Sequence, residues 1–317
     1  MMRKFCWAAL AALAAVSCSE KEADIPQGGV GDELVTFSVS VPEIGTKSVA
    51  GSDDDEKAIS SLQVFVFNKH GVYETSAVAA AGEASVTCTV GDKKIVALVN
   101  AAAFDDVTSY QDLVGRTIYL KDSGVGKLVM FGETTAVVSA QTSVNVEVSY
   151  LSSKVVLESV VLEFENEEHK ELDFAIESVY LLNVAGDRKL VGESAPQVWH
   201  NLGKLDSGSG LLSFLYDDVA SVTLQSGGAG YSTEHYFYCY QNPTSAKTRL
   251  VIEAKIDNEL YYYPIDVNTL LPNNEYSYRV KLTRLGTDTP DGSLEEGTCS
   301  VTVSIKDWVQ NSSDVTI

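Results

Sequence analysis

Two segments near opposite ends of the 317-residue chain share a strict alternation of apolar and polar residues. Residues 34–41 read LVTFSVSV and residues 298–308 read TCSVTVSIKDW. A period of two with many β-branched residues predicts half-buried β-strands. The side chains expected on the two apolar faces are Val35, Phe37, Val39 and Val41 in the first segment, and Cys299, Val301, Val303 and Ile305 in the last. Two strands with matching patterns could occupy the same kind of groove, so the last strand of one molecule could replace the first strand of a neighbour.

Between these segments the pattern predicts many short strands separated by turns. One helical turn is expected at residues 110–114, and a hairpin is expected around Gly91 and Asp92. The predicted strands cover residues 59–67, 86–90, 94–99, 116–120, 127–131, 143–150, 154–164, 175–183, 211–215, 221–224, 234–240, 249–256, 261–267 and 276–284. This rhythm is typical of an all-β sandwich fold. The length suits two domains, with a boundary near 151–153 that separates residues 33–152 from residues 153–317.

The first residues have the pattern of a targeting signal. Arg3 and Lys4 precede an apolar run, residues 5–16, that is too short to span a bilayer comfortably. Residues 15–18 read AVSC, which resembles the lipobox of bacterial lipoproteins. We therefore expect a lipoprotein signal at residues 1–17, a lipid on Cys18 and a flexible tether at residues 18–32. The alternative is an ordinary secretory signal with an incidental cysteine.

Composition narrows the choice of partners. The formal net charge of −21 repels phosphate backbones and makes nucleic acid a poor partner. The hydrophobic content of 45% is enough for a sizeable core. Without the signal and Cys18, the chain has three cysteines, Cys88, Cys239 and Cys299, each beside apolar neighbours on its strand face. They read as small buried hydrophobes rather than a disulfide framework, although the count leaves room for one bridge.

The segment after the first predicted strand is expected to be an exposed loop. It contains Pro42, two glycines and four consecutive acids, residues 53–56. Lys47 lies in the middle of it and is followed by Ser48. A basic residue in such a loop is a cutting site for a trypsin-like protease, and the simpler alternative is a solvated lysine. The four acids are expected to be solvated rather than to form a calcium site, because the spacing of an EF-hand is absent.

No motif predicts catalysis, a metal site or a cofactor. The four histidines, His70, His169, His200 and His235, are isolated and form no recognisable ligand set. Nucleophile elbows, phosphate loops and zinc-protease motifs are absent from the sequence. We therefore expect a protein that is not an enzyme and binds no cofactor, while a β-sandwich hydrolase with scattered carboxylates stays a third alternative.

Several stretches together resemble the Bacteroidales fimbrillins, the FimA-type subunits of type V pili. They are residues 59–68 (ISSLQVFVFN), 178–184 (SVYLLNV), 236–242 (YFYCYQN), 271–278 (LPNNEYSY) and 301–308 (VTVSIKDW). The resemblance implies two tandem transthyretin-like β-sandwich domains. It also implies export as a lipidated (palmitate-bearing) precursor on the outer membrane, followed by incorporation into a surface fimbrium.

The resemblance further implies how subunits would assemble. A trypsin-like protease would cut after Lys47 and leave Ser48 as the new first residue. The strand at residues 34–41 would be lost, and a donor strand from another subunit, Cys299 to Trp308, would fill its groove. The chain would then be a stalk or tip subunit, with or without an adhesive role, and its partners would be other pilus subunits. The alternatives are a monomeric surface lipoprotein that binds glycan or protein, and a pilus anchor subunit that keeps its lipid.

Overall fold

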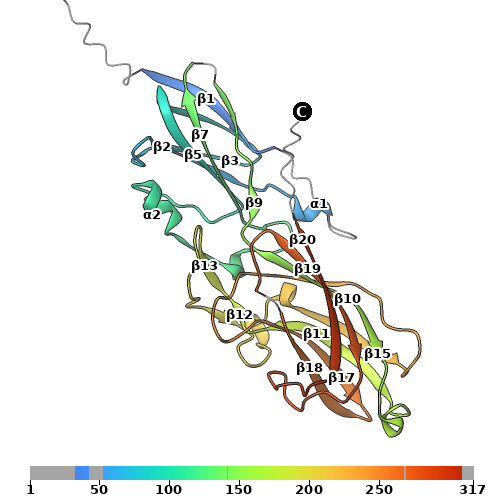
Figure 1. Ribbon diagram of the computed structural model, residues 1–317. Helices are drawn as coiled ribbons and strands as arrows, with labels where there is room; N and C mark the ends of the chain where they lie inside the picture. Colours follow the sequence, from blue (N-terminus) through green and yellow to red (C-terminus); the bar gives the residue numbers. More distant parts are fainter. Residues whose placement is uncertain (1–32, 43–52, 141, 268, 309–317) are drawn as a thin grey trace, which may run out of the picture.

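The computed structural model describes residues 33–42, 53–140, 142–267 and 269–308. Strands dominate these residues, so the predicted all-β class is confirmed. Figure 1 shows an elongated molecule, with the sheets of the N-terminal and C-terminal halves at its two ends. The helices in the described residues are short: α1 (Asp53–Glu56), α2 (Tyr110–Val114) and 3-10 turns at Leu120–Asp122, Glu167–His169, Gly208–Gly210 and Ser213–Leu215.

The N-terminal half is a sandwich of two sheets. One sheet has the strand order β4-β1-β8 and the other has the order β3-β2-β5-β7-β9. The strands are β1 (Leu34–Ser40), β2 (Leu62–Asn68), β3 (Tyr73–Ala79), β4 (Glu83–Thr89), β5 (Gly91–Val99), β7 (Met130–Val138), β8 (Ser143–Asn145) and β9 (Ser149–Tyr150). Val39 of β1 packs between the sheets with Val64, Ile95 and Met130. The core of this half therefore includes the first strand of the described chain.

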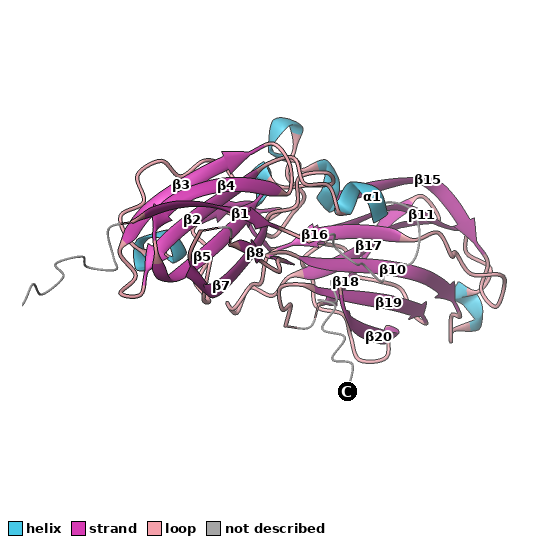
Figure 2. Cartoon of the chain, turned by 90° about the horizontal axis from the view of Figure 1, so that it is seen from above, coloured by secondary structure: helices cyan, strands magenta, loops and turns pink. Residues whose placement is uncertain are grey.

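The C-terminal half contains two four-stranded sheets, ordered β16-β10-β19-β20 and β15-β11-β17-β18. Their strands are β10 (Ser153–Leu162), β11 (Phe174–Leu182), β15 (Tyr216–Leu224), β16 (His235–Cys239), β17 (Arg249–Ile256), β18 (Glu259–Asp266), β19 (Asn274–Leu282) and β20 (Cys299–Asp307). Figure 2 shows β10, β19 and β20 side by side, with β20 at the edge. The last strand of the chain therefore has a described strand on only one of its sides.

Two small sheets complete the structure. One joins β12 (Val184–Ala185) to β14 (Trp199–His200), and the other joins β6 (Thr117–Tyr119) to β13 (Asp187–Lys189). Because β6 precedes residue 150 and β13 follows residue 153, this second pair links the two halves of the chain. A division into domains at residues 33–152 and 153–317 stays our interpretation.

The predicted hairpin around Gly91 and Asp92 is wrong. Strands β4 and β5 follow one another but lie in different sheets: β4 pairs with β1, and β5 pairs with β2 and β7. The burial patterns explain the difference. Only alternate residues of β4 are buried, whereas β5 is buried along its last five residues, so the two strands suit different sheets. Gly91 supports the sharp change of direction with a φ of 111°, which favours glycine.

Other departures from the predicted elements have equally local causes. The apolar run at 211–215 is not a strand; it ends in the 3-10 turn Ser213–Leu215, whose Leu215 is buried. The predicted strand at 143–150 divides into β8 and β9, because the chain passes there from one sheet to the other. Strand β3 was not predicted, since it is a polar edge strand without fully buried residues. The helical turn at residues 110–114 is confirmed as α2.

Replacing Phe37 by Ala tests how much β1 contributes to the fold. Phe37 is 3% exposed in the core of the N-terminal half, so Phe37→Ala should lower the free energy of unfolding of the uncut chain by about 3–5 kcal/mol. Urea unfolding followed by circular dichroism measures this loss. The control is Thr36→Ala on the opposite, exposed face of the same strand, with an expected change of about 0.5 kcal/mol or less. Equal losses for the two variants would show that β1 is not inserted as described.

Candidate functional site

The first strand occupies a slot between two neighbours. β1 runs antiparallel to β4 over seven residue pairs, from Leu34 opposite Thr89 to Ser40 opposite Glu83. On its other side it runs parallel to β8 over three pairs. All four side chains predicted for the inner face are buried in one core cluster: Val35, Phe37, Val39 and Val41. Removing β1 would therefore uncover apolar core and the hydrogen-bonding edges of two strands.

The outer face of β1 is held by hydroxyl groups. Thr36 Oγ1 lies 2.7 Å from Thr87 Oγ1 on β4. Ser38 donates to the carboxylate of Glu83, and Ser40 donates to Asn145 Oδ1 on β8 at 2.5 Å. Both neighbouring strands thus contact the outward side chains of β1 as well as its backbone. A strand that replaced β1 would need small hydroxyl residues on this face as well as apolar residues on the other.

The last strand is held more loosely along its length. β20 pairs only with β19 among the described strands, over nine residue pairs from Asn274–Asp307 to Leu282–Cys299. Its predicted donor residues Cys299, Val301 and Val303 are half-buried against the core of the C-terminal half, and Ile305 is 55% exposed. The structure thus brings these four residues onto one face, as the alternation predicted, but does not bury them fully.

Trp308 differs from the other predicted donor residues. It follows β20 and is buried at the junction of the two halves, in the core cluster that also contains Phe37. Its ring stacks on Tyr150 of β9, with 4.0 Å between centroids, and on Tyr238 of β16, with 5.5 Å between centroids. Its indole N–H donates to Glu56 Oε2 at 3.0 Å. The residue at the end of β20 is therefore held more firmly than the rest of the strand.

Glu56 lies at the centre of a buried polar cluster, although the sequence predicted a solvated acidic loop there. That prediction is wrong for Glu56, which is 0% exposed. Its carboxylate accepts from Tyr238 Oη at 2.6 Å and forms an ion pair with Lys154 Nζ at 2.7 Å. Its backbone carbonyl accepts from Tyr150 Oη at 2.8 Å. Because α1 lies against β10 and β16 (Figure 2), three protein donors replace water around this carboxylate: Tyr238, Lys154 and Trp308.

A second carboxylate completes the cluster. Glu275 of β19, also buried, pairs with Lys306 of β20 at 2.8 Å and lies 3.8 Å from Lys154 Nζ. Two acids and two lysines thus balance in charge at the junction. Sequence reasoning missed this cluster, because its members are far apart in the chain. The one available signal was Lys154, a lysine at the start of the long apolar run of β10.

The predicted processing residues lie outside the described residues. These are Cys18, Lys47 and Ser48. Among the described residues, Val41 is buried just before Pro42, and α1 begins at Asp53. The predicted cutting site thus falls between a strand inserted in the N-terminal core and a helix that carries Glu56.

The histidines and acids of the described residues do not gather into a metal site. No group of three or more His, Cys, Asp or Glu side chains within them is placed to hold a metal ion. His235 contacts Asp217 at 2.9 Å and Tyr231 at 2.7 Å, without a nucleophile beside it. Within the same residues, no helix is long and apolar enough to cross a membrane.

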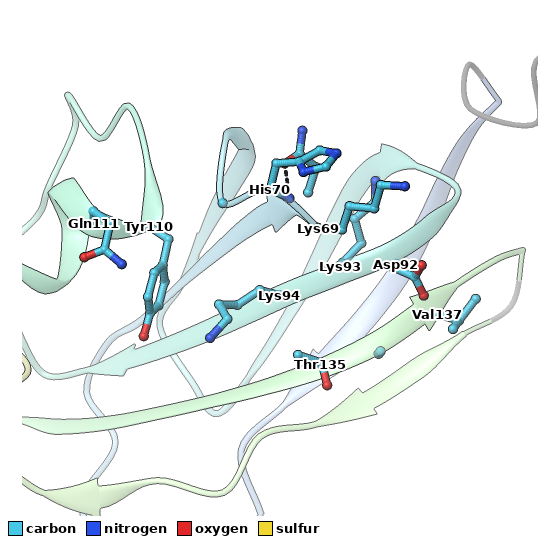
Figure 3. Close-up of a pocket in the computed structure, with 12 residues that line it drawn as sticks. Lys69, His70, Asp92, Lys93, Lys94, Tyr110, Gln111, Thr135 and Val137 are labelled. Carbon is cyan, nitrogen blue, oxygen red and sulfur yellow. Dashed lines mark hydrogen bonds between the residues drawn. The ribbon is translucent and has the colours of Figure 1, made fainter.

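An open groove of about 500 Å³ lies on the N-terminal half (Figure 3). Three lysines line it, Lys69, Lys93 and Lys94, and the last two have partners within the protein. Lys93 is paired with Glu74 at 2.7 Å, while Lys94 is paired with Glu133 at 3.2 Å and lies over the Tyr110 ring. The charges of Lys93 and Lys94 are therefore neutralised within the protein, and we assign no ligand to the groove.

Comparison with known proteins gives the class of protein first. A fimbrilin from Porphyromonas gingivalis W83 has the same fold, with a TM-score of 0.64 and 18% identity over 87% of this chain and 98% of that one. A candidate cell adhesion protein from Bacteroides eggerthii gives a TM-score of 0.65 and 20% identity over 87% and 97%. The tip fimbrial protein Mfa3 from Porphyromonas gingivalis, with a C-terminal truncation, gives 0.51 and 13% over 87% and 100%. The fold is therefore that of fimbrial proteins.

Part of the sequence also matches a known protein family. Residues 35–172 match the family model of the major fimbrial subunit protein FimA, from within β1 to just before β11. No curated protein sequence matches the chain. The predicted resemblance to the fimbrillins is confirmed by the family match and the shared fold. The family model covers less than half of the chain, and the shared fold extends over most of it.

Replacing Trp308 by Phe tests the junction. Trp308→Phe keeps an aromatic ring against Tyr150 but removes the N–H bond to Glu56. Because hydrogen bonds to charged groups contribute about 1.5–3 kcal/mol, we expect a loss of that size in the free energy of unfolding of the uncut chain, measured in urea. Hydrogen exchange at the β20 amides should accelerate in parallel. The matched control is Trp199→Phe, on half-buried β14. If both variants behave alike, Trp308 does not anchor β20.

Proposed function

We propose that the chain is a stalk or tip subunit of a surface fimbria, built by donor-strand exchange. The precursor is exported as an outer-membrane lipoprotein carrying its lipid on Cys18. A trypsin-like protease cuts after Lys47, the β1 segment leaves, and β20 of another subunit enters the vacated slot between β4 and β8. The partners are thus other pilus subunits, the protease and, before cleavage, the outer membrane.

The observation that carries this proposal is the match between β1 and β20. The inner residues of β1 are apolar, and its outer residues Thr36, Ser38 and Ser40 bear hydroxyl groups that contact both neighbouring strands. β20 has apolar residues at the equivalent alternate positions and hydroxyl residues between them: Ser300, Thr302 and Ser304. It therefore satisfies the requirement of the slot on both faces.

The energies favour exchange once β1 is gone. In its own subunit β20 has one neighbouring strand, β19, and leaves Ile305 half-exposed. In the slot it would have two neighbours, which satisfy the unpaired N–H and C=O groups on both of its sides. Fully burying a Val or Ile side chain contributes about 1.5–3 kcal/mol. Val301, Val303 and Ile305 start only partly buried, so insertion into the slot would bury more of each side chain.

The positions of slot and donor imply a filament. The slot is in the N-terminal half and β20 belongs to the C-terminal half. Each joint would therefore pair two different surfaces, the slot of one subunit and the last strand of the next. Such head-to-tail contacts build an open chain unless rotation closes them into a ring. The elongated shape in Figure 1 is suited to stacking end to end.

A second candidate is a protein that keeps β1, either a pilus anchor subunit or a monomeric surface lipoprotein that binds glycan or protein. One observation favours it: in this structure β1 fills its slot and β20 is paired within the same chain. The two candidates differ in the first residue of the surface form. A start at Ser48 in protein sheared from its own cells supports the fimbrial subunit, and a lipid-bearing start at Cys18 supports the second candidate.

Blocking the cut should block assembly. Lys47→Gln removes the basic residue that a trypsin-like protease needs, so the surface protein should keep β1 and give no polymer ladder on an unboiled detergent gel. Lys57→Gln, a nearby lysine just after α1, is the control and should give the ladder of the unaltered protein. A normal ladder from Lys47→Gln would contradict cutting at this residue.

A charge on the donor face should block insertion. Val303→Asp would bring a carboxylate into the apolar slot, and a buried, unpaired charge is strongly unfavourable. We expect a secreted monomer that polymerises at least tenfold less than the unaltered protein, measured by electron microscopy and by the unboiled ladder. The control is Ser304→Asp on the outer face of the strand, which would take the position of Ser40 beside Asn145 and should retain more polymer. Fibres of normal length from Val303→Asp would rule out β20 as the donor.

A further inference from the structure

The slot of β1 contains a cysteine whose position is fixed by the strand register. Cys88 of β4 lies directly opposite Val35 of β1, and both side chains face the core. Cys88 is 3% exposed and is a free thiol. Any strand that replaces β1 in the same direction places the residue equivalent to Val35 against this thiol.

The residue of β20 equivalent to Val35 is Cys299, also a free thiol. Matching the alternation places Cys299, Val301, Val303 and Ile305 in the sites of Val35, Phe37, Val39 and Val41. A shift of two residues in one direction would put Asp307 in the site of Val41, which is 8% exposed, and bury a charge. A shift in the other direction would put Gly297 in the site of Val35 and leave Ile305 outside the slot. One register therefore fills all four apolar sites.

The direction of insertion follows from the edges of the slot. β4 offers an antiparallel ladder of seven pairs, whereas β8 offers a parallel ladder of only three. Insertion in the opposite direction would turn the long ladder parallel, which is slightly less stable for each residue. The donor strand should therefore run in the direction of β1, with Cys299 at the position of Val35.

We propose that Cys299 of one subunit forms a disulfide with Cys88 of the next, so that the fimbrial joint becomes covalent. This inference rests on the proposed donor-strand exchange. Residues directly opposed in an antiparallel pair have Cα atoms about 4.5–5.5 Å apart, which lies within the range of about 4.4–6.8 Å for disulfides. The S–S bond forms as the two thiols release two protons and pass two electrons to a disulfide oxidant, which is reduced to two thiols.

The same structure explains why the bond would form only in the polymer. Before cleavage Val35 covers Cys88, and burial raises the pKa of the Cys88 thiol. Burial also raises the pKa of Cys299, which packs against its own C-terminal half. The third thiol, Cys239, is 0% exposed in that half, and burial raises its pKa to about 12, so it does not compete. Exchange of the strands is the step that places two thiols opposite each other.

Two gels on one sample test the inference and the proposed function separately. The purified full chain is treated with a trypsin-like protease in the presence of oxidised glutathione, and remaining thiols are alkylated before denaturation. An unboiled reducing gel detects strand exchange, and a boiled non-reducing gel detects the disulfide. We expect ladders on both gels, and the boiled ladder should collapse to monomer when a reductant is added.

The outcomes are distinguishable. A ladder that appears only on the unboiled gel leaves donor-strand exchange standing and overturns the disulfide. The absence of both ladders overturns both proposals. In Cys88→Val and in Cys299→Val, the boiled non-reducing gel should show no covalent ladder, whatever amount of polymer the unboiled gel contains. A covalent ladder that persists in either variant would overturn the pairing of Cys88 with Cys299.

Moving the pair by one rung provides the matched control for register. On the background of Cys88→Val and Cys299→Val, the added changes Val86→Cys and Val301→Cys should restore the covalent ladder, because residue 301 would lie opposite residue 86. In a variant with only Cys299→Val and Val301→Cys, the new thiol at residue 301 would lie opposite Val86, two residues along β4 from Cys88. This variant should give little crosslink. Equal crosslinking in both variants would show that the donor has no fixed register and would overturn the inference.

Discussion

The structure depends on one constraint: the N-terminal core closes only when a strand lies between β4 and β8. β1 and the adjoining Val41 supply four buried apolar side chains, and β1 is paired through its backbone on both sides, so it cannot leave without uncovering the core. Edge strands can be lost at small cost, but the loss of a central strand exposes two edges at once. In the proposed exchange, a subunit that lost β1 would therefore be destabilised until another strand filled the slot, and this instability would give assembly its direction.

In the C-terminal half, β20 is an edge strand that is held weakly along most of its length and firmly at its end. Among the described strands, β20 has one neighbour, β19. Trp308, however, stacks on Tyr150 of the N-terminal half and donates a hydrogen bond to Glu56. Glu56 is on α1, just beyond the segment that contains Lys47. Glu56 and Trp308, which directly follows β20, thus meet in one buried cluster. Before any exchange, this cluster holds β20 against its own subunit.

Alternation in the sequence was enough to predict the faces of β1 and β20, because a strand with one buried face leaves a period-two pattern that few other structures produce. It failed where strands change sheets. Strands β4 and β5 look like a hairpin in sequence, yet each pairs with partners far along the chain. The burial of Glu56 could not be predicted, because a run of acidic residues indicates a solvent-exposed loop unless the partners of each acid are known. Here the partners are Lys154 and Trp308, which are about 100 and 250 residues away.

Periodicity alone does not define the register of a donor strand. Moving an alternating strand by two residues keeps apolar residues facing the core and hydroxyl residues facing out, so many positions look alike. The degeneracy ends at Asp307, because the alternation would place its charge on the inner face. Together with Lys306, it marks where the part of β20 that fits an apolar slot must stop. Four residues of the apolar face precede this point, from Cys299 to Ile305, and four apolar residues are buried from Val35 to Val41. In the proposed exchange, this equal number aligns Cys299 with Val35.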